Sequence, residues 1–285
     1  MTGKNMNYYK NCLLCPRNCG VERLADLQRG FRQKKGYCGE SAQLRIASAD
    51  LHFGEEKPIT GRGGSGTIFI SGCSLGCIFC QNHDISQGNP SFGKVISISD
   101  FADICLKLEL KGAENINIVT GSHAVPTIIE GIKTAKKMGL QLPVIWNSSA
   151  YEKTETLDLL KGYIDIFLPD LKTLDSLIAH KLFNAPDYPE IAAAAILKMT
   201  EMCERVIIRH LILPGLLEST RSVLHWISQN VKDRVTLSLM NQYYPAGKNP
   251  YVKDMPKRRL TKDEYDTSIC WLKEFGIEDV LVQTW

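Results

Sequence analysis

The cysteines are the residues of this chain best able to bind a metal or carry out redox chemistry, and seven of the ten fall in two short groups. One group has the spacing Cys-x3-Cys-x2-Cys, and the other has Cys-x2-Cys-x3-Cys-x18-Cys. Residues 1–10 are polar and lack the apolar stretch of a signal peptide, so we expect a cytoplasmic protein. In that reducing compartment, grouped thiols indicate metal or redox chemistry rather than disulfides.

The central group consists of Cys73, Cys77 and Cys80, which supply three thiolates from one tight loop. Three ligands on a cubane cluster leave one iron open to bind a substrate or cofactor, whereas four would close it. A zinc loop and three incidental thiols are the alternatives. Zinc normally takes a fourth ligand, for which His83 is a candidate, but that choice leaves the three-cysteine set unexplained. The spacing therefore favours a cluster with catalytic access.

The N-terminal group has four members, Cys12, Cys15, Cys19 and Cys38. Four thiolates complete either a tetrahedral zinc site or a second, auxiliary iron–sulfur cluster. The spacing differs from the paired Cys-x2-Cys of zinc ribbons, and both metals stay open, with a slight preference for zinc or another structural metal. Either metal would stabilise a segment too short to fold on a hydrophobic core of its own.

These groups need elements that position them, and the chain from residue 67 alternates short apolar runs with helical patterns. Such alternation predicts a parallel sheet covered by helices. About six units suit an α/β fold with a partial or complete (βα) barrel. The expected strands are 67–71, 116–119, 143–147, 164–168, 206–211, 235–240 and 280–282.

Two domains are expected: a Cys-rich metal-binding module with a helix at 1–53, and the barrel core at 54–285. The module's helix is predicted over 41–53, where Leu44, Ala47 and Leu51 share one helical face. In the barrel, a capping box of Thr261 and Glu264 predicts the start of a late helix.

Composition narrows the function classes. Hydrophobic residues make up 44% of the 285 residues, enough for a substantial core, which excludes a disordered or fibrous protein. The formal net charge of +3 argues against a nucleic-acid partner. No apolar run approaches the roughly 20 residues of a membrane-spanning helix, so no membrane association is expected.

The segment Cys73-x3-Cys77-x-Phe79-Cys80 resembles the signature of the radical S-adenosylmethionine (SAM) enzymes, because an aromatic residue precedes the last cysteine and a predicted strand precedes the first. Later segments are similar to the branch around pyruvate formate-lyase activating enzyme, especially its uncharacterised iron–sulfur relatives. The resemblance covers nearly the whole chain, including the element Cys-Leu-Leu-Cys-Pro-Arg-Asn-Cys at 12–19. It implies a radical SAM barrel and a [4Fe–4S] cluster on the central cysteines.

The resemblance also implies residues that contact SAM. Thr120 and Gly121 match the family's Gly-Gly-Glu segment, although the next residues, Ser122 and His123, depart from it. The other matches are a ribose-binding turn, an Asp-x-Lys element, a carboxylate-binding arginine and a late strand end. The implied set is Phe79, Thr120, Gly121, Asn147, Asp170, Lys172, Arg209 and Gln242.

Blander alternatives stay open for some of these residues. Asp170 with Lys172 could be a surface ion pair, and Arg209 could be a buried structural arginine. His123 is interpreted as a helix-start histidine rather than a catalytic one, and no catalytic side chain is assigned.

The implied activity is reductive cleavage of SAM to methionine and a 5′-deoxyadenosyl radical, which abstracts hydrogen from a substrate. Activation of a glycyl radical enzyme is one candidate role, and modification of another protein or peptide, of an RNA base or of a small metabolite stays open. The expected electron donor is a flavodoxin or ferredoxin. The alternative from another class is a non-catalytic iron–sulfur electron carrier or a metal-stabilised interaction protein. A carrier would need no SAM pocket, so the elements around Asp170, Lys172 and Arg209 count against it.

Overall fold

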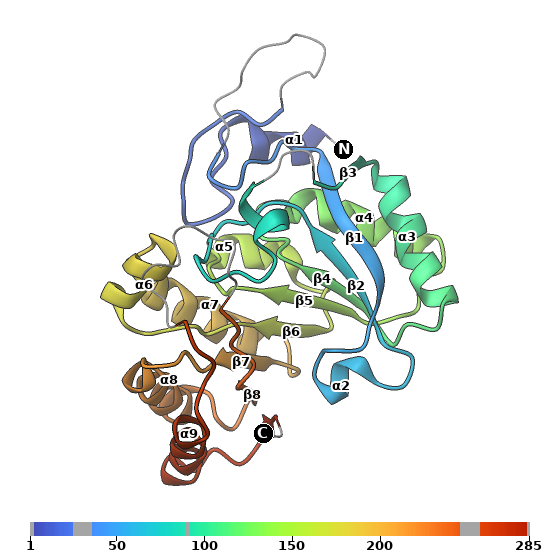
Figure 1. The fold of residues 1–285 in the computed structure, drawn as a ribbon. Coiled ribbons are helices and arrows are strands. Elements are labelled where there is room, and N and C mark those ends of the chain that lie inside the picture. Colours follow the sequence, from blue (N-terminus) through green and yellow to red (C-terminus); the bar gives the residue numbers. More distant parts are fainter. Residues whose placement is uncertain (1–2, 25–35, 89–91, 246–256, 284–285) are drawn as a thin grey trace.

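A computed structural model describes residues 3–24, 36–88, 92–245 and 257–283 of the chain. Its centre is an open, mostly parallel sheet (Figure 1). Strands β2, β4, β5 and β6 are parallel neighbours, and β1 pairs antiparallel with both β2 and β3. The bounds are β1 Leu44–His52, β2 Ser65–Ile70, β3 Lys94–Ile96, β4 Ile116–Val119, β5 Val144–Ser148 and β6 Ile166–Pro169.

A second parallel set continues this sheet: β7 (Ile207–Leu211), β8 (Thr236–Met240) and β9 (Val280–Val282). It meets β6 through two isolated parallel bridges, Phe167 with Val206 and Asp170 with Arg209. The order β3-β1-β2-β4-β5-β6 followed by β7-β8-β9 makes a partial barrel rather than a closed one. The predicted α/β class is confirmed, and each of the seven expected strands overlaps an observed one.

Helices follow the strands and cover the sheet. Amphipathic α3 and α4 contact each other on one side of it, and α8 and α9 pack together beside β7 and β8 (Figure 1). The predicted capping box is confirmed, since Thr261 and Glu264 satisfy each other's backbone amides at the start of α9. The helices are α1 Gly3–Lys10, α2 Lys57–Thr60, α3 Ile98–Leu110, α4 Val125–Lys137, α5 Thr154–Leu157, α6 Ser176–Phe183, α7 Tyr188–Met202, α8 Leu217–Asn230 and α9 Lys262–Glu274.

The helix predicted over 41–53 is wrong, because Leu44–His52 forms strand β1. Leu44 and Ile46 alternate with partly exposed neighbours, which is the two-residue period of a strand. A register shift between Ile46 and Ser48 interrupts that alternation and produced the apparent helical spacing. The boundary predicted at residue 53 stays a prediction, and β1 pairs with β2 across it.

Most of the buried side chains form one continuous hydrophobic core. Strands β5 and β6 are buried along their whole length, as expected for parallel strands covered on both faces. A small separate cluster of Tyr9, Cys12, Leu14 and Ala42 belongs to the N-terminal segment. Within the described residues, no helix is both long and apolar enough to cross a membrane.

Candidate functional site

The central cysteines lie in the loop that follows β2, at the carboxyl end of that strand. Gly72 and Gly76 have φ angles of +81° and +72°, which allow the tight turns around Cys73. The Leu75 amide donates to the Cys73 sulfur at 3.4 Å, and the Cys80 amide donates to the Cys77 carbonyl oxygen at 3.1 Å. The three cysteines thus lie on one tight loop, near enough for Cys73 and Cys80 to act electrostatically on Cys77.

Burial raises the pKa of the Cys73 and Cys77 thiols, and the nearby Cys80 thiol raises both further. Such thiols ionise when a metal centre supplies positive charge, so the donor set suits iron. No group of three or more His, Cys, Asp or Glu side chains in the described ranges is arranged to hold a single metal ion. Zinc or a second cluster at the N-terminal cysteines stays a prediction.

Phe79 packs into the protein and is 8% exposed. Its ring centroid lies 6.1 Å from that of Phe183, and the Ile78 amide beside it donates to the Leu182 carbonyl oxygen at 3.0 Å. Both partners belong to α6, so this aromatic residue anchors the cysteine loop to a helix. The contacts described for Phe79 are packing contacts.

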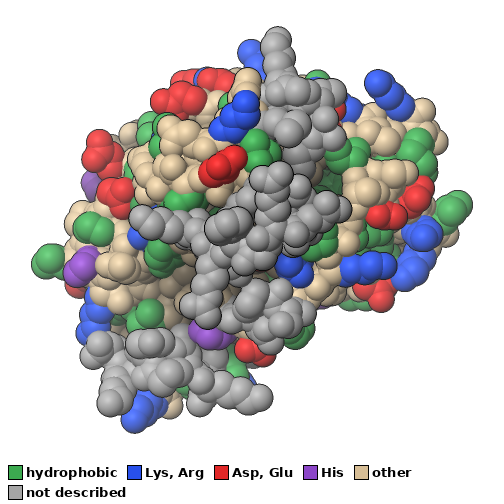
Figure 2. All heavy atoms as spheres, turned by 90° about the horizontal axis from the view of Figure 1, so that it is seen from above, with side chains coloured by type: hydrophobic (Ala, Val, Ile, Leu, Met, Phe, Trp, Pro, Cys, Tyr) green, Lys and Arg blue, Asp and Glu red, His purple; other side chains and the backbone are tan. Residues whose placement is uncertain are grey.

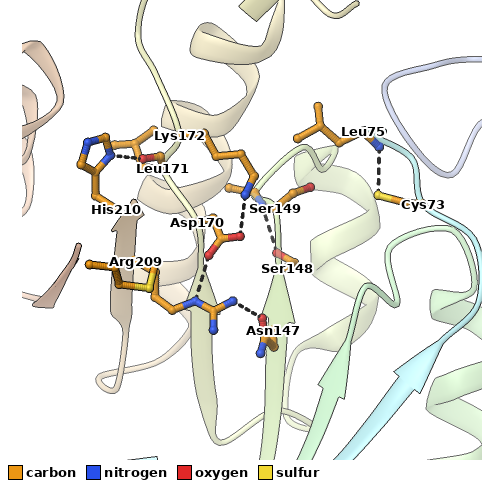
Figure 3. A network of polar contacts seen from close by, with 12 residues as sticks. Cys73, Leu75, Asn147, Ser148, Ser149, Asp170, Leu171, Lys172, Arg209 and His210 are labelled. Carbon is orange, nitrogen blue, oxygen red and sulfur yellow. Dashed lines mark hydrogen bonds and ion pairs between the residues drawn. The ribbon is translucent and has the colours of Figure 1, made fainter. Parts of the chain in front are cut away.

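A network of polar and charged side chains joins the carboxyl ends of β5 and β6 to Arg209, in the middle of β7 (Figure 3). The Asp170 carboxylate accepts from Lys172 Nζ at 2.8 Å and from Arg209 Nε at 2.8 Å. Arg209 also donates to Asn147 Oδ1 at 2.6 Å and to Glu55 Oε2 at 3.3 Å. Four of the residues predicted from sequence thus form one cluster, to which Glu55 is an unpredicted addition.

The cluster reaches the cysteine loop through Lys172. Burial disfavours its charge, but Asp170 and then Cys77 outweigh that effect and raise the pKa of Lys172. In the same way Arg209 and Lys172 hold the pKa of Asp170 below its usual value despite burial. The site therefore places one carboxylate between two cations, beside a cysteine ligand of the predicted cluster.

Tyr188, which sequence reasoning missed, fixes the backbone of this cluster. Its buried hydroxyl accepts from the Lys172 amide at 3.0 Å and lies 2.8 Å from the Asp170 carbonyl oxygen. The same hydroxyl lies 3.1 Å from the Ser149 carbonyl oxygen. No local pattern signals this role, because the tyrosine starts α7, well after the strand ends it supports.

His210 follows Arg209 on β7 and is also buried (Figure 3). Its Nδ1 donates to the Leu171 carbonyl oxygen at 2.7 Å, which leaves Nε2 to accept from the Thr220 hydroxyl at 3.0 Å. Burial lowers the pKa of His210 to about 4. The imidazole is therefore neutral near pH 7 and holds the chain after Asp170 against α8.

Thr120 and Gly121 lie directly after β4, as predicted. The Thr120 amide donates to the Asn147 carbonyl oxygen at 2.9 Å, and Thr120 itself has a φ of +64°. A Cβ at Gly121 would lie 2.5 Å from Trp146 Cη2, so only glycine fits there. This close approach packs the turn against β5, next to Asn147.

A buried carboxyl group, Glu152, lies behind this turn. It accepts from the Ser122 hydroxyl at 2.7 Å, Trp146 Nε1 at 2.9 Å and the Ser148 hydroxyl at 2.6 Å. Burial raises the pKa of Glu152. Ser122, which departs from the Gly-Gly-Glu pattern, thus contacts a glutamate from another strand end, a pairing that sequence position does not reveal.

Two further predicted or discussed residues have different surroundings. Gln242 bonds to Gln283 at 2.8 Å beyond the ends of β8 and β9, and its amide nitrogen lies 3.7 Å from the Met240 sulfur. His123 is buried just before α4, and burial lowers its pKa to about 3. The contacts described for Gln242 do not include the Asp170 cluster.

Solved structures similar to this chain share its fold. SuiB of Streptococcus suis matches with a TM-score of 0.53 and 15% identity, covering 77% of this chain and 48% of SuiB. SuiB bound to the precursor peptide SuiA matches with a TM-score of 0.52 and 14% identity, covering 74% of this chain and 46% of SuiB. The chain thus spans about half the length of SuiB.

Sequence comparisons identify the family. A protein of Methanocaldococcus jannaschii, described as uncharacterized, is 32% identical over 281 residues, covering 95% of this chain and 77% of the relative. The family model of the Radical SAM superfamily matches residues 67–227, which include the cysteine loop as well as Asn147, Asp170 and Arg209. The chain belongs to the radical SAM superfamily.

Proposed function

We propose that this radical SAM enzyme removes a hydrogen atom from a peptide segment of a protein, and that its substrate is a glycyl radical enzyme that it activates. Family membership itself implies an enzyme with a [4Fe–4S] cluster and SAM. The observation that carries the proposal is the position of Lys172. Its Nζ lies 2.8 Å from the Asp170 carboxylate, and its charge also interacts with that of Cys77. A zwitterionic ligand and a cluster would meet at that place.

The chain offers a matching group for each part of SAM. Asp170 suits an ammonium group, and Lys172 and Arg209 suit a carboxylate. Arg209 has five N–H groups, and its three bonds within the described residues leave two of them for a ligand. The Asn147 amide suits a ribose hydroxyl. Cys73, Cys77 and Cys80 would hold the cluster.

When bound, the cluster and SAM would supply one-electron cleavage of a sulfonium and a carbon radical able to take a hydrogen atom. The protein's own part is to orient the ligand and to exclude water that would intercept reactive species. Tyr188 orients the backbone of Asp170 and Lys172, and the buried rings of Phe79 in the cysteine loop and Trp146 in β5 exclude water from their surroundings.

Two observations support a peptide substrate. The fold is similar to that of SuiB, which has been solved with a precursor peptide. Around the residues drawn in grey, Figure 2 shows basic, acidic and hydrophobic side chains mixed together, a pattern that suits a polypeptide better than a polyanion. The electron for SAM cleavage would come from a flavodoxin or ferredoxin.

The test is anaerobic reconstitution with iron and sulfide, followed by a reductant and SAM. We expect 5′-deoxyadenosine from the wild-type protein with dithionite, and also with reduced flavodoxin or ferredoxin. Addition of a glycyl radical enzyme should give the doublet of a glycyl radical in the EPR spectrum.

A deuterated substrate identifies the abstracted atom. If the glycine of the partner carries deuterium, the released 5′-deoxyadenosine should gain one deuterium. Deuterium uptake from a different labelled peptide residue would refute the activase role but keep the peptide substrate. Absence of 5′-deoxyadenosine from fully loaded protein would refute the proposal as a whole.

A further inference from the structure

The N-terminal segment is hydrogen-bonded to the cysteine loop through one arginine, Arg17. Its guanidinium donates to two carbonyl oxygens of the cysteine loop, those of Ser74 at 2.9 Å and Leu75 at 2.9 Å. It also donates to two carbonyl oxygens at the end of α6, those of Phe183 at 2.8 Å and Asn184 at 2.6 Å. A single planar fork thus ties the loop to the helix against which Phe79 packs.

Tyr37, at the other end of the segment, contacts both Arg17 and the cysteine loop. Its ring lies under the Arg17 guanidinium, 3.8 Å from ring centroid to Cζ, and its hydroxyl donates to the Leu75 carbonyl oxygen at 3.3 Å. A Cβ at Gly76 would lie 2.7 Å from that hydroxyl oxygen. At Gly72 an added Cβ would lie 2.6 Å from the Cys38 carbonyl oxygen. The two cysteine groups therefore touch through backbone.

Two of the four N-terminal cysteine sulfurs, those of Cys12 and Cys19, accept hydrogen bonds from this segment. The Tyr37 amide donates to the Cys19 sulfur at 3.3 Å. Cysteine sulfurs that accept such hydrogen bonds are suited to act as thiolate ligands of a metal.

A buried cation accompanies these sulfurs. Arg23 is 3% exposed, donates to the Cys12 sulfur at 3.3 Å, and directs its other bonds to carbonyl oxygens. A buried guanidinium requires anionic charge nearby, and metal-bound thiolates would provide it. This pairing is a second observation, independent of the cysteine spacing, for a metal at the N-terminal site.

Arg17 and Tyr37, the two residues that contact the cysteine loop, are close in sequence to the N-terminal cysteines. Arg17 lies between Cys15 and Cys19, and Tyr37 directly precedes Cys38. The segment's own core is small, with Tyr9 and Leu14 among its few buried members. Such a segment depends on a cross-link to keep its shape.

We infer that the N-terminal cysteines bind a metal centre that stabilises the conformation of the catalytic loop, an effect called the brace below. Arg17 and Tyr37 are the positioning residues that connect the N-terminal site to the loop. The inference rests on the assignment of the catalytic cluster to Cys73, Cys77 and Cys80, and it does not depend on the peptide substrate. Loss of the N-terminal metal would free the loop even though every catalytic ligand is intact. The N-terminal metal therefore sets how firmly the catalytic cluster is held.

Hydrogen–deuterium exchange of the full-length, metal-loaded protein tests the brace without relying on turnover. The reporters are the amides of Gly72, Ile78 and Cys80, which donate to carbonyl oxygens within and beside the loop. Arg17→Lys keeps the charge but cannot bond four carbonyl oxygens, and we expect these amides to exchange at least about tenfold faster. Arg221→Lys is the matched control, since Arg221 is exposed and pairs with Glu274 far from the loop.

Metal analysis and EPR separate a positioning role from a general loss of stability. Arg17→Lys should keep the N-terminal metal at wild-type stoichiometry, while the reduced catalytic cluster shows a broadened or weakened SAM-induced spectral change. A lower melting temperature with unchanged loop exchange and an unchanged SAM-induced spectrum would overturn the inference. Arg17→Ala is a stronger second variant, and if it fails to fold, Arg17→Lys decides.

The reverse perturbation removes the N-terminal metal and leaves Arg17 in place. Cys19→Ser, with Cys15→Ser added if one substitution does not release the metal, should accelerate exchange of the same amides. Unchanged exchange after demonstrated loss of the N-terminal metal would refute the brace. A wild-type protein that fails to release 5′-deoxyadenosine would contradict the proposed function, but the exchange result would still decide the brace.

Discussion

Replacement of Arg209 by lysine should separate the forked geometry of its guanidinium from its charge. Lysine can keep the ion pair with Asp170, now 2.8 Å from Arg209 Nε. It cannot at the same time reach Asn147 Oδ1, which accepts from Arg209 at 2.6 Å, and Glu55, which accepts at 3.3 Å. Arg209→Lys therefore removes the link from β7 to β5 and to the segment before α2.

The magnitude follows from the bonds that are lost. The side chains of Arg209 and Asp170 are 16% and 18% exposed, so solvent screens their interactions only in part. Loss of the bond to Asn147 and of the weaker contact with Glu55 should lower the free energy of unfolding by about 2 kcal/mol. Loss of a forked contact to a ligand carboxylate should cost a similar amount, so the Kd for SAM should rise about thirtyfold.

The assay is SAM titration of the reduced, cluster-loaded protein by EPR, with thermal unfolding measured on the same samples. Arg221→Lys is the control, because its exposed pair with Glu274 should change the free energy of unfolding by less than about 0.5 kcal/mol. A Kd for Arg209→Lys within twofold of wild type would refute the role of Arg209 in carboxylate binding. An unchanged melting temperature would refute the cross-strand link.

Three further predictions follow from single contacts. Cys77→Ala should abolish release of 5′-deoxyadenosine in the chromatographic assay, whereas the exposed Cys270→Ala should retain it, and full activity of Cys77→Ala would exclude the cluster assignment. Gly121→Ala should lower the free energy of unfolding by about 1–3 kcal/mol in denaturant melts, because its Cβ would lie 2.5 Å from Trp146, and a neutral result would contradict the tight packing of this turn. Burial lowers the pKa of His210 from 6.5 to about 4 in the folded protein, so the unfolded chain binds more protons between these two pH values. The free energy of unfolding therefore falls as the pH is lowered through that window. Wild type should therefore lose about 1 kcal/mol more than His210→Gln between about pH 7.5 and pH 5.5 in melts, and parallel curves would disprove a buried neutral His210.

The sheet was predictable because its strands carry their own signal. The runs Ile116–Val119, Val144–Ser148 and Ile166–Pro169 are mostly apolar, and burial on both faces is what such runs require. Strand β1 was missed for the opposite reason. Only part of it alternates, and the register shift after Ile46 gave a spacing that imitated a helix.

The candidate site was predictable where its residues lie in, or directly after, parallel strands. Asn147, Asp170 and Arg209 meet because β5 pairs in parallel with β6, and Asp170, directly after β6, forms a parallel bridge with Arg209 of β7. Glu55 and Tyr188 reach the same cluster from segments with no strand-end pattern, so no local spacing could reveal them. Arg17 had a signal, its place between two cysteines, but its four acceptors depend on how the loop and α6 pack.

The junction of β6 and β7 is held in an unusual way. Backbone pairing there is reduced to two isolated bridges, one of which joins Asp170 to Arg209, the same residues whose side chains form an ion pair. A ligand held by both residues would thus fasten two portions of the barrel wall to each other. Ligand binding would then hold β6 and β7 together. At a ligand concentration of about a hundred times the Kd, it would raise the free energy needed to separate these two strands by about 2.7 kcal/mol.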